Sequence, residues 1–301
     1  MTNKILLVDI GGTNIRYAYA DLIKKNIQQL QKLPLEDISR FDNILYDLLT
    51  EHGCDVLVLS AAGPKINNKI KMTNRNIVFD SEQIKSKYSL SECHLLNDWE
   101  AIAYSYEFLK DDLMTIQKGI NFNKTSLFFG PGTGLGAAIM IDKKIVLPSE
   151  LGNTDINVNK FLQNFNILDD SFKKIEDIIS GTGISKIYSI KKNENYTSEQ
   201  LLNNYKDGDK VAIDVINSFT ISLAQLLSNL TLAYFVGNGL YLAGGFIRDF
   251  SKIMNKEIFI ENFTFNNSDT HSDILKKASI SVITKEKTPL YGNLYYFLNL
   301  K

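Results

Sequence analysis

The fold of this chain is decided near its start, by the stretch Leu6-Leu7-Val8-Asp9-Ile10-Gly11-Gly12-Thr13-Asn14-Ile15-Arg16-Tyr17-Ala18-Tyr19-Ala20. An apolar run before the two glycines predicts a buried strand, and a β-branched and aromatic run after them predicts its hairpin partner. Glycine has no Cβ, so the turn lets backbone amides approach a ligand closely. Residues in and beside the turn could hold a phosphate and its Mg²⁺. Asp9 supplies a carboxylate, Thr13 and Asn14 supply short polar side chains, and Gly11 and Gly12 supply backbone amides. An ordinary solvated hairpin explains these residues equally well, because short glycine motifs recur in unrelated proteins.

The composition is that of a globular protein with no electrostatic preference for a partner. The chain has 301 residues, 44% of them hydrophobic and 22% charged, which suits one large or two medium domains. Its 33 basic and 34 acidic residues give a formal charge of -1, so we expect neither nucleic acid nor a membrane as a partner. We expect no apolar run near the ~20 residues that cross a bilayer. A strand predicted at 4–8 leaves no room for a signal peptide, so we expect a cytoplasmic protein.

Cysteines and histidines are too scattered to build a site. Cys54 and Cys93 lack the CxxC spacing of a zinc site and are too few for a disulfide framework. His52, His94 and His271 are equally isolated, and we expect none of them to bind a metal or act as a catalytic base. A site in this chain must therefore use carboxylates, amides and backbone groups.

Alternating strand and helix signals predict an α/β fold. We expect strands at 26–33, 55–62 and 280–284, and helices at 41–52, 81–88 and 209–237. Thr288 and Pro289 predict the N-cap and first residue of a final helix. The polar stretch 193–209 is expected to be a surface excursion.

A second glycine-rich turn repeats the opening design. Between strands predicted at 125–129 and 137–141 stands Gly130-Pro131-Gly132-Thr133-Gly134-Leu135-Gly136. Two such turns, each with a threonine at its centre, predict a duplicated domain whose hairpins hold a phosphate chain from opposite sides. Further along, Gly244 and Gly245 open a predicted helix, as expected where a backbone lets a flat ligand or its phosphates come close.

Several polar residues allow either a functional or a structural interpretation. Asn97 and Asp98 end a predicted strand and begin a helix, where ligands gather in open α/β sheets. An acid at that place also serves as a helix cap or a first-turn charge. Glu150 lies in a predicted loop at 147–153 and Glu176 in a predicted amphipathic helix at 171–179, and both could simply face water.

Taken together, the motifs occur in the order and spacing of the bacterial glucokinases, which the chain resembles from about residue 4 to its final helix. They are Asp9-Ile10-Gly11-Gly12-Thr13-Asn14, Met72-Thr73-Asn74, Asn97-Asp98, Gly132-Thr133-Gly134-Leu135-Gly136, Glu150, Glu176 with Ser180-Gly181, and Ala243-Gly244-Gly245. That family belongs to the hexokinase and actin-like ATPase superfamily. The resemblance implies two actin-like (ribonuclease H-like) α/β domains hinged over a central cleft. Residues 1–108 with 287–301 would form the smaller domain, and 109–286 the larger.

The resemblance also implies an activity and a set of site residues. It implies a kinase that transfers phosphate from ATP to the C6 hydroxyl of glucose, with Asp98 as the general base. The sugar would be bound by Asn97, Asp98, Glu150, Asn153 and Glu176. ATP would be bound by Asp9, Gly11, Gly12, Thr13, Asn14, Gly132, Thr133, Gly134, Gly244 and Gly245, and Asp9 would hold Mg²⁺. We further expect a homodimer.

The sequence departs from the family pattern beside Glu150. Asn153 stands where a sugar-contacting His is usual in Glu-x-Gly-His, and Ser149 and Leu151 stand where glycines are common. These departures concern the sugar and not the reaction, so glucose and another hexose or amino sugar both stay open. A hypothesis from a different class is a non-catalytic sensor or assembly protein that binds nucleotide. The presence of Asp98 and Glu150 argues against it, because a filament protein has no use for sugar-binding carboxylates.

Overall fold

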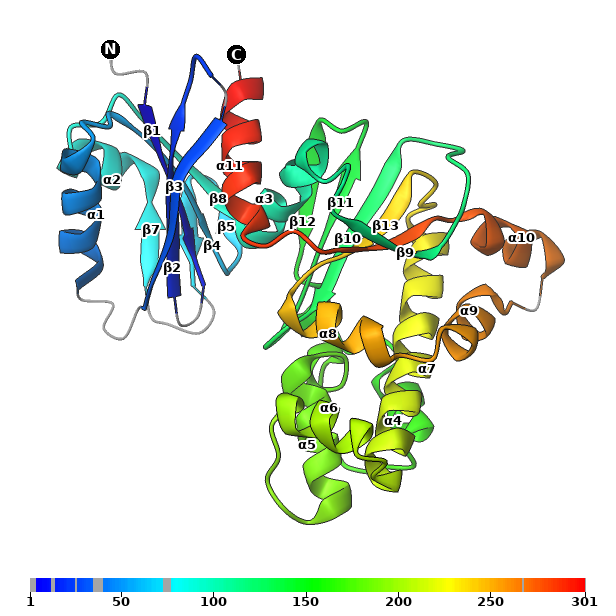
Figure 1. Ribbon diagram of the computed structural model, residues 1–301. Coiled ribbons are helices and arrows are strands. Elements are labelled where there is room, and N and C mark those ends of the chain that lie inside the picture. Colours follow the sequence, from blue (N-terminus) through cyan, green and yellow to red (C-terminus); the bar gives the residue numbers. More distant parts are fainter. Residues whose placement is uncertain are drawn as a thin grey trace. The chain divides into compact units, whose positions relative to one another are not determined.

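The structure is a computed structural model that describes residues 4–11, 14–24, 26–34, 40–72, 77–266 and 268–300. The chain divides into two compact units, and the α/β fold class is confirmed (Figure 1). Unit 1 comprises Met1–Lys110 and Lys285–Lys301, and unit 2 comprises Asp111–Thr284. The chain thus passes from one unit to the other close to the expected residues 108 and 287.

Unit 1 is built on a five-stranded sheet with the strand order β3-β2-β1-β4-β8. Its strands are β1 (Lys4–Ile10), β2 (Asn14–Asp21), β3 (Asn26–Pro34), β4 (Val56–Ala61) and β8 (Glu92–Asn97). The first three form an antiparallel meander, and β1, β4 and β8 run parallel. A small antiparallel sheet lies beside them, made of β5 (Lys65–Ile66), β6 (Lys69–Lys71) and β7 (Val78–Asp80).

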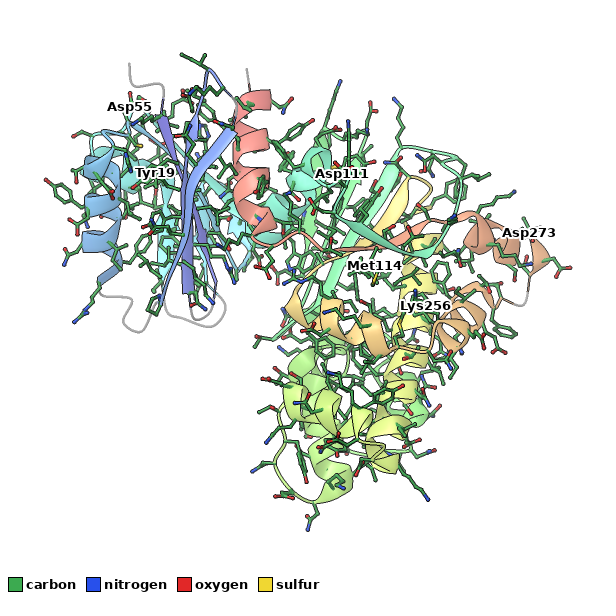
Figure 2. All side chains as sticks on the ribbon, in the orientation of Figure 1. Tyr19, Asp55, Asp111, Met114, Lys256 and Asp273 are labelled. Carbon is green, nitrogen blue, oxygen red and sulfur yellow. The ribbon has the colours of Figure 1, made fainter. Side chains whose placement is uncertain are left out.

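Different helices cover the two faces of this sheet, because alternate residues of a strand point to opposite faces. Leu6 and Val8 belong to the core cluster on the side of α1 (Phe41–Glu51) and α2 (Ser81–Lys87). Ile5 and Leu7 belong to the cluster on the side of α3 (Asp98–Tyr104) and α11 (Thr288–Asn299). A 3-10 turn, η2 (Ser105–Phe108), follows α3. Tyr19, labelled in Figure 2, joins β2 to α1, since its hydroxyl donates to the Leu48 carbonyl oxygen at 3.0 Å.

Unit 2 repeats the design in a six-stranded sheet with the order β12-β11-β10-β13-β14-β9. The strands are β9 (Leu113–Gln117), β10 (Thr125–Pro131), β11 (Leu135–Ile141), β12 (Ile145–Ser149), β13 (Gly239–Leu242) and β14 (Ile280–Ile283). Again a three-stranded meander is followed by two strands parallel to its first member, and β9 is added antiparallel to β14. This shared order confirms the predicted duplication.

Helices of unit 2 pack around a long central one, α7 (Lys210–Ala233). The others are α4 (Val158–Asn164), α5 (Gly181–Lys192), α6 (Ser198–Lys206), α8 (Gly245–Ile253), α9 (Lys256–Thr264) and α10 (Asp269–Lys277), with the 3-10 turns η3 (Leu151–Asn153) and η4 (Ile175–Asp177). By length and composition α7 could cross a bilayer, which corrects the expectation that no segment approaches that limit. Its apolar window is 67% buried inside the protein, as in the core helix of a globular domain.

The helix expected at 171–179 is wrong. Only the turn η4 forms there, because Lys174 is extended and the Ile175 amide donates to the Thr154 carbonyl oxygen at 2.8 Å. That amide therefore cannot form a hydrogen bond within a helix. The loop expected at 147–153 is also wrong in part, since it contains the end of β12 and η3.

Two further boundaries differ from expectation. The polar stretch 193–209 contains α6, which begins with a capping box between Thr197 and Gln200 and buries Leu201 completely. The final helix is preceded by Lys287 in the left-handed conformation, with φ 56°. Thr288 is therefore the first helical residue and not the N-cap.

Candidate functional site

The first glycine turn connects β1 to β2 as predicted. Ile10 pairs with Ile15 at the end of the ladder, and the Gly11 amide donates to the Asn14 carbonyl oxygen at 3.0 Å. Four motif residues lie outside the part of the chain that the structure describes: Gly12, Thr13, Thr73 and Asn74.

Asp9 lies buried near the carboxyl end of β1, with 3% of its surface exposed. Its Oδ2 accepts a hydrogen bond from Arg16 Nη1 at 2.7 Å, and its Oδ1 accepts one from Ser60 Oγ at 3.1 Å. Arg16 reaches Asp9 because the two residues are partners across β1 and β2. Burial raises the pKa of the Asp9 carboxyl, and the neighbouring guanidinium acts in the opposite direction.

A buried amide of the C-terminal helix supports this carboxylate. Asn293 of α11 has no exposed surface, and its Nδ2 donates to the Val8 carbonyl oxygen at 2.9 Å and to Ser60 Oγ at 3.2 Å. Ser60 in turn donates to Asp9, so a chain of hydrogen bonds leads from α11 to the Asp9 carboxylate.

The surroundings of Asp9 suit Mg²⁺ only together with a substrate. Each of its carboxylate oxygens keeps a lone pair beyond the bonds to Arg16 and Ser60, and Mg²⁺ in kinases uses one or two carboxylates plus phosphate oxygens and water. No group of three or more His, Cys, Asp or Glu side chains that could hold a metal occurs within the described ranges. Asp9 therefore fits the metal as one ligand among others that a nucleotide must supply.

Asn97 and Asp98 lie at the same edge of the sheet, where β8 leads into α3. Asn97, not Asp98, is the N-cap: its Oδ1 accepts from the Trp99 amide at 2.9 Å and from the Glu100 amide at 3.2 Å. Its Nδ2 donates to the Gly63 carbonyl oxygen at 2.9 Å. Asn97 thus keeps one N–H for a ligand, and its capping role fixes Asp98 at the first helical position.

In unit 2 the second glycine turn is held by two neighbouring segments. The Gly132 amide donates to the Gly134 carbonyl oxygen at 2.8 Å, and the Gly181 amide donates to the Gly132 carbonyl oxygen at 2.7 Å. Glu176 Oε2 accepts from the Leu135 amide at 3.1 Å. A Cβ on Gly134 would lie only 2.5 Å from that oxygen, so the glycine allows this close approach of the carboxylate.

The expected sugar-binding residues of unit 2 form one network, and a lysine joins them. Asn153 Nδ2 donates to Glu150 Oε2 at 3.2 Å, and Lys174 Nζ donates to Asn153 Oδ1 at 3.0 Å. Lys174 Nζ also forms an ion pair with Glu176 Oε1. The structure therefore brings Glu176 together with Glu150 and Asn153, which lie more than 20 residues earlier in the sequence.

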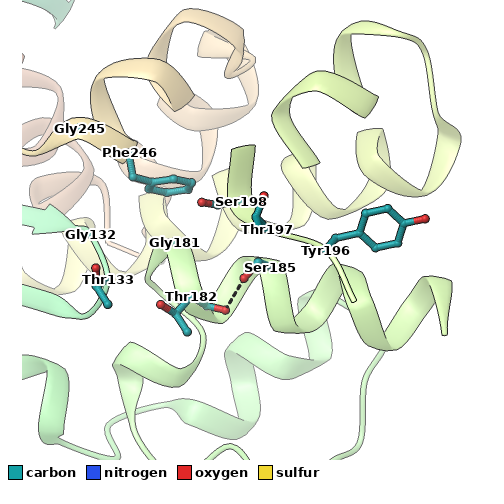
Figure 3. A pocket seen from close by; sticks show the side chains of 10 residues that line it. All are labelled: Gly132, Thr133, Gly181, Thr182, Ser185, Tyr196, Thr197, Ser198, Gly245 and Phe246. Carbon is teal, nitrogen blue, oxygen red and sulfur yellow. Dashed lines mark hydrogen bonds between the residues drawn. The ribbon is translucent and has the colours of Figure 1, made fainter. Parts of the chain in front are cut away.

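A pocket of about 580 Å³ opens in unit 2 beside the second glycine turn (Figure 3). This volume is in the range of small-molecule sites. Hydroxyls, glycines and two aromatic rings line it: Gly132, Thr133, Gly181, Thr182, Ser185, Tyr196, Thr197, Ser198, Gly245 and Phe246. Gly244, with φ 117°, precedes α8 in a conformation that favours glycine. The turn, the start of α5 and the start of α8 thus meet at one cavity.

Sequence reasoning missed Arg16, Lys174 and most of the pocket lining. Arg16 could have been found from strand pairing, because it faces Asp9 in the predicted hairpin. The capping box at Thr197 could have placed a helix start near the pocket. Lys174 gave no signal of its own, since its partner Asn153 lies 21 residues away.

Known proteins resemble this chain over most of its length. The model of the family described as Glucokinase matches residues 6–300. A glucokinase of Saccharophagus degradans is 27% identical, covering 95% of this chain and 96% of its own length. One of Colwellia psychrerythraea is 29% identical, covering 97% and 95%.

Solved structures share the fold. A glucokinase from an Antarctic psychrotroph superposes with a TM-score of 0.80 at 24% identity, covering all of both chains. The glucokinase of Balamuthia mandrillaris, crystallised with glucose, superposes with a TM-score of 0.79 at 20% identity, covering 98% of this chain and 93% of its own. The architecture is thus the two-domain actin-like fold of sugar kinases, and the chain belongs to the glucokinase family of enzymes.

Proposed function

We propose that this enzyme transfers the γ-phosphate of ATP to the C6 hydroxyl of glucose, giving glucose 6-phosphate and ADP. The observation that carries the proposal is the bond from the Leu135 amide to Glu176. This bond connects the network of Glu150, Asn153, Lys174 and Glu176 to the glycine turn that lines the pocket. A hexose needs partners that both donate and accept hydrogen bonds, and carboxylates with amides supply them.

The pocket of unit 2 is assigned to ATP. Phe246 offers a flat apolar wall for the base, and Gly244 and Gly245 let α8 begin close to the adenosine. The phosphates would be bound by the turn of Gly132, Thr133 and Gly134, and by the first turn of unit 1 with Gly11, Gly12, Thr13 and Asn14. Asp9 would hold Mg²⁺ through water. The metal, when bound, would neutralise phosphate charge as the transferred group departs.

Asp98 is assigned as the general base, and Asn97, Glu150, Asn153 and Glu176 as sugar ligands. The Asp98 carboxylate takes the proton of the C6 hydroxyl while that oxygen forms its bond to the γ-phosphorus. The bond from the γ-phosphorus to the bridging oxygen breaks, and ADP leaves. A cytoplasmic homodimer is part of the same proposal.

The test is Asp98→Asn, which keeps the shape of the side chain but cannot accept the proton. We expect kcat to fall by ~10²–10⁴-fold while sugar binding is retained, because general-base catalysis contributes about that much. A coupled ADP-release assay gives kcat, and calorimetry gives sugar affinity. The control is Asp111→Asn, which makes the same change at an exposed position. A kcat above about a tenth of wild type would refute the role of Asp98.

The alternative is a kinase for another hexose or an amino sugar. Asn153 supports this alternative, because it stands where the family pattern has a sugar-contacting His. The same assay on glucose, mannose, fructose, galactose and N-acetylglucosamine separates the two. Glucose is expected to give the highest kcat/KM. Another sugar used ten times better would overturn the choice of glucose and leave the kinase assignment in place.

A further inference from the structure

Lys174 joins Glu150, Asn153 and Glu176 of unit 2 into one hydrogen-bonded cluster. Its ammonium contacts Asn153 Oδ1 at 3.0 Å and pairs with Glu176 Oε1. We propose that Lys174 is a specificity-determining residue of the acceptor subsite, which donates to a hydroxyl of the sugar and fixes Asn153 as a hydrogen-bond donor. This inference rests on the proposed function, because it takes Glu150, Asn153 and Glu176 as sugar ligands.

The orientation of the Asn153 amide follows from its two neighbours. An ammonium has only donors, so the atom that faces Lys174 must be the carbonyl oxygen. A carboxylate has only acceptors, so the atom that faces Glu150 must be the nitrogen, as the 3.2 Å contact shows. Both partners demand the same orientation. Asn153 therefore points its remaining N–H away from Lys174 and can donate it to a sugar, while Lys174 occupies one lone pair of its carbonyl oxygen.

Lys174 itself has one donor left for a ligand. Its contacts with Asn153 and Glu176 use two of its three N–H groups. Glu176 raises the pKa of Lys174 by accepting its hydrogen bond, so the charged form persists at neutral pH. The side chain is 37% exposed, and a ligand bound to the cluster can reach it.

The backbone of Lys174 is fixed more firmly than that of an ordinary surface lysine. Its amide and that of Lys173 both donate to Asp177 Oδ2, at 3.0 and 2.8 Å. The next amide, of Ile175, donates to the Thr154 carbonyl oxygen just beyond Asn153. These bonds hold the segment of Lys174 against the segment of Asn153, so the ammonium is placed between its partners by the fold.

The ion pair is not needed for stability. A partly exposed lysine–glutamate pair usually contributes little to folding, so its removal should leave the protein folded. This separates a role in sugar binding from a structural one. The adjacent Lys173 is exposed and supplies a matched control, because its loss removes the same charge one residue away.

The experiment compares full-length wild type, Lys174→Met and Lys173→Met in steady-state assays with glucose and ATP. We expect Lys174→Met to raise the KM for glucose roughly 10- to 150-fold, the effect of losing a hydrogen bond from a charged group, with kcat and the KM for ATP little changed. Lys173→Met should match wild type. Lys174→Arg, which keeps charge and donors, should recover part of the loss.

A set of glucose analogues, each lacking one hydroxyl, locates the contact. Wild type should lose affinity for the analogue that lacks the partner of Lys174, and Lys174→Met should lose nothing further with that analogue. Equal KM values for Lys174→Met and Lys173→Met would overturn the inference. So would a set of analogues in which Lys174→Met loses the same affinity with every one. If wild type phosphorylates no sugar, the proposed function has failed instead, and calorimetric titration of glucose into wild type and Lys174→Met still decides the role of Lys174.

Discussion

Phe246 is the residue that gives the pocket of unit 2 a fixed flat wall. Its ring stacks on Phe250 with centroids 5.7 Å apart and meets the edge of Phe219 at the same distance. One part of the side chain therefore packs against the core of unit 2 while another lines the pocket. A Cβ on Gly181 would meet the Phe246 ring at an ordinary contact distance of 3.4 Å, but would lie only 3.0 Å from the Gly132 carbonyl oxygen.

We predict that Phe246→Leu weakens ATP binding without weakening sugar binding. Leucine keeps the apolar packing on Phe219 and Phe250 but removes the ring face, and stacking of a base on an aromatic ring is worth ~1–3 kcal/mol. The KM for ATP should therefore rise roughly 5- to 150-fold, with the KM for glucose unchanged. Tyr196→Phe, which keeps its ring, is the control. An unchanged KM for ATP would place the base elsewhere.

At this scale the sequence indicates acids and glycines far better than their partners. Asp9 could be singled out because it stands beside a glycine turn, and Glu150 and Glu176 only through the resemblance to the glucokinases; their binding roles stay predictions. Lys174 could not, because its role depends on a contact across 21 residues that exists only once β12 and η4 are placed. A lone lysine is usually solvated, and nothing local distinguishes this one.

Among the elements, the contact of α3 with α11 places the greatest demand on a single residue. Gly292 of α11 lies against the backbone of α3, where an added Cβ would overlap the Ala101 carbonyl group and lie 3.1 Å from the Ser105 amide nitrogen. The two helices can approach this closely only because Gly292 has no side chain. Their contact also positions Asn293, the next residue along α11.

We predict that Gly292→Ala destabilises unit 1, although alanine is the better helix former by ~1 kcal/mol. Forcing extra volume into a packed contact costs typically ~1–3 kcal/mol and more where backbone must move, so the steric cost should exceed the gain in propensity. Thermal unfolding followed by circular dichroism measures the result. Gly132→Ala is the control, because a Cβ at Gly132 meets nothing within 4 Å. A variant as stable as wild type would contradict the close contact.

Elements with one clear buried face were predicted well, and the others were not. The helices at α1 and α7 follow from apolar residues at helical spacing. α6 was missed because only Leu201 is buried on it, so its periodicity is weak and only its capping box signals it. The error at 171–179 has the opposite cause. Ile175, Ile178 and Ile179 have helical spacing, but a tertiary bond from the Ile175 amide to Thr154 and local bonds from two preceding amides to Asp177 replace the helix.

For the whole molecule, the important feature is that unit 1 is discontinuous. Leu290, Leu294 and Phe297 of α11 belong to the core cluster on one face of the unit 1 sheet. Without α11 that face keeps only α3 as a cover, and Asn293 no longer binds the Val8 carbonyl oxygen. Unit 2, by contrast, is formed by one continuous segment.

We predict that a chain ending at residue 284 keeps a folded unit 2 and loses unit 1. Amide hydrogen exchange followed by mass spectrometry should show fast exchange in β1 and β4 and wild-type protection in β10 and α7. The control is a chain ending at Asn299, the last residue of α11. Protection of β1 and β4 in the shorter chain would mean that α11 is dispensable.

The late arrival of α11 also sets an order of events during synthesis. The strands of the unit 1 sheet are synthesised before unit 2. The helix α11, which packs on one face of that sheet, is synthesised after unit 2. At ~5–20 residues per second the ribosome needs on the order of ten seconds or more to pass through unit 2. For that time α11 does not cover Ile5, Leu7 and Val58. Chaperones that bind apolar strands can recognise a nascent chain in this state. Unit 2 can fold on the ribosome as soon as it emerges, whereas unit 1 cannot be completed until α11 has been made.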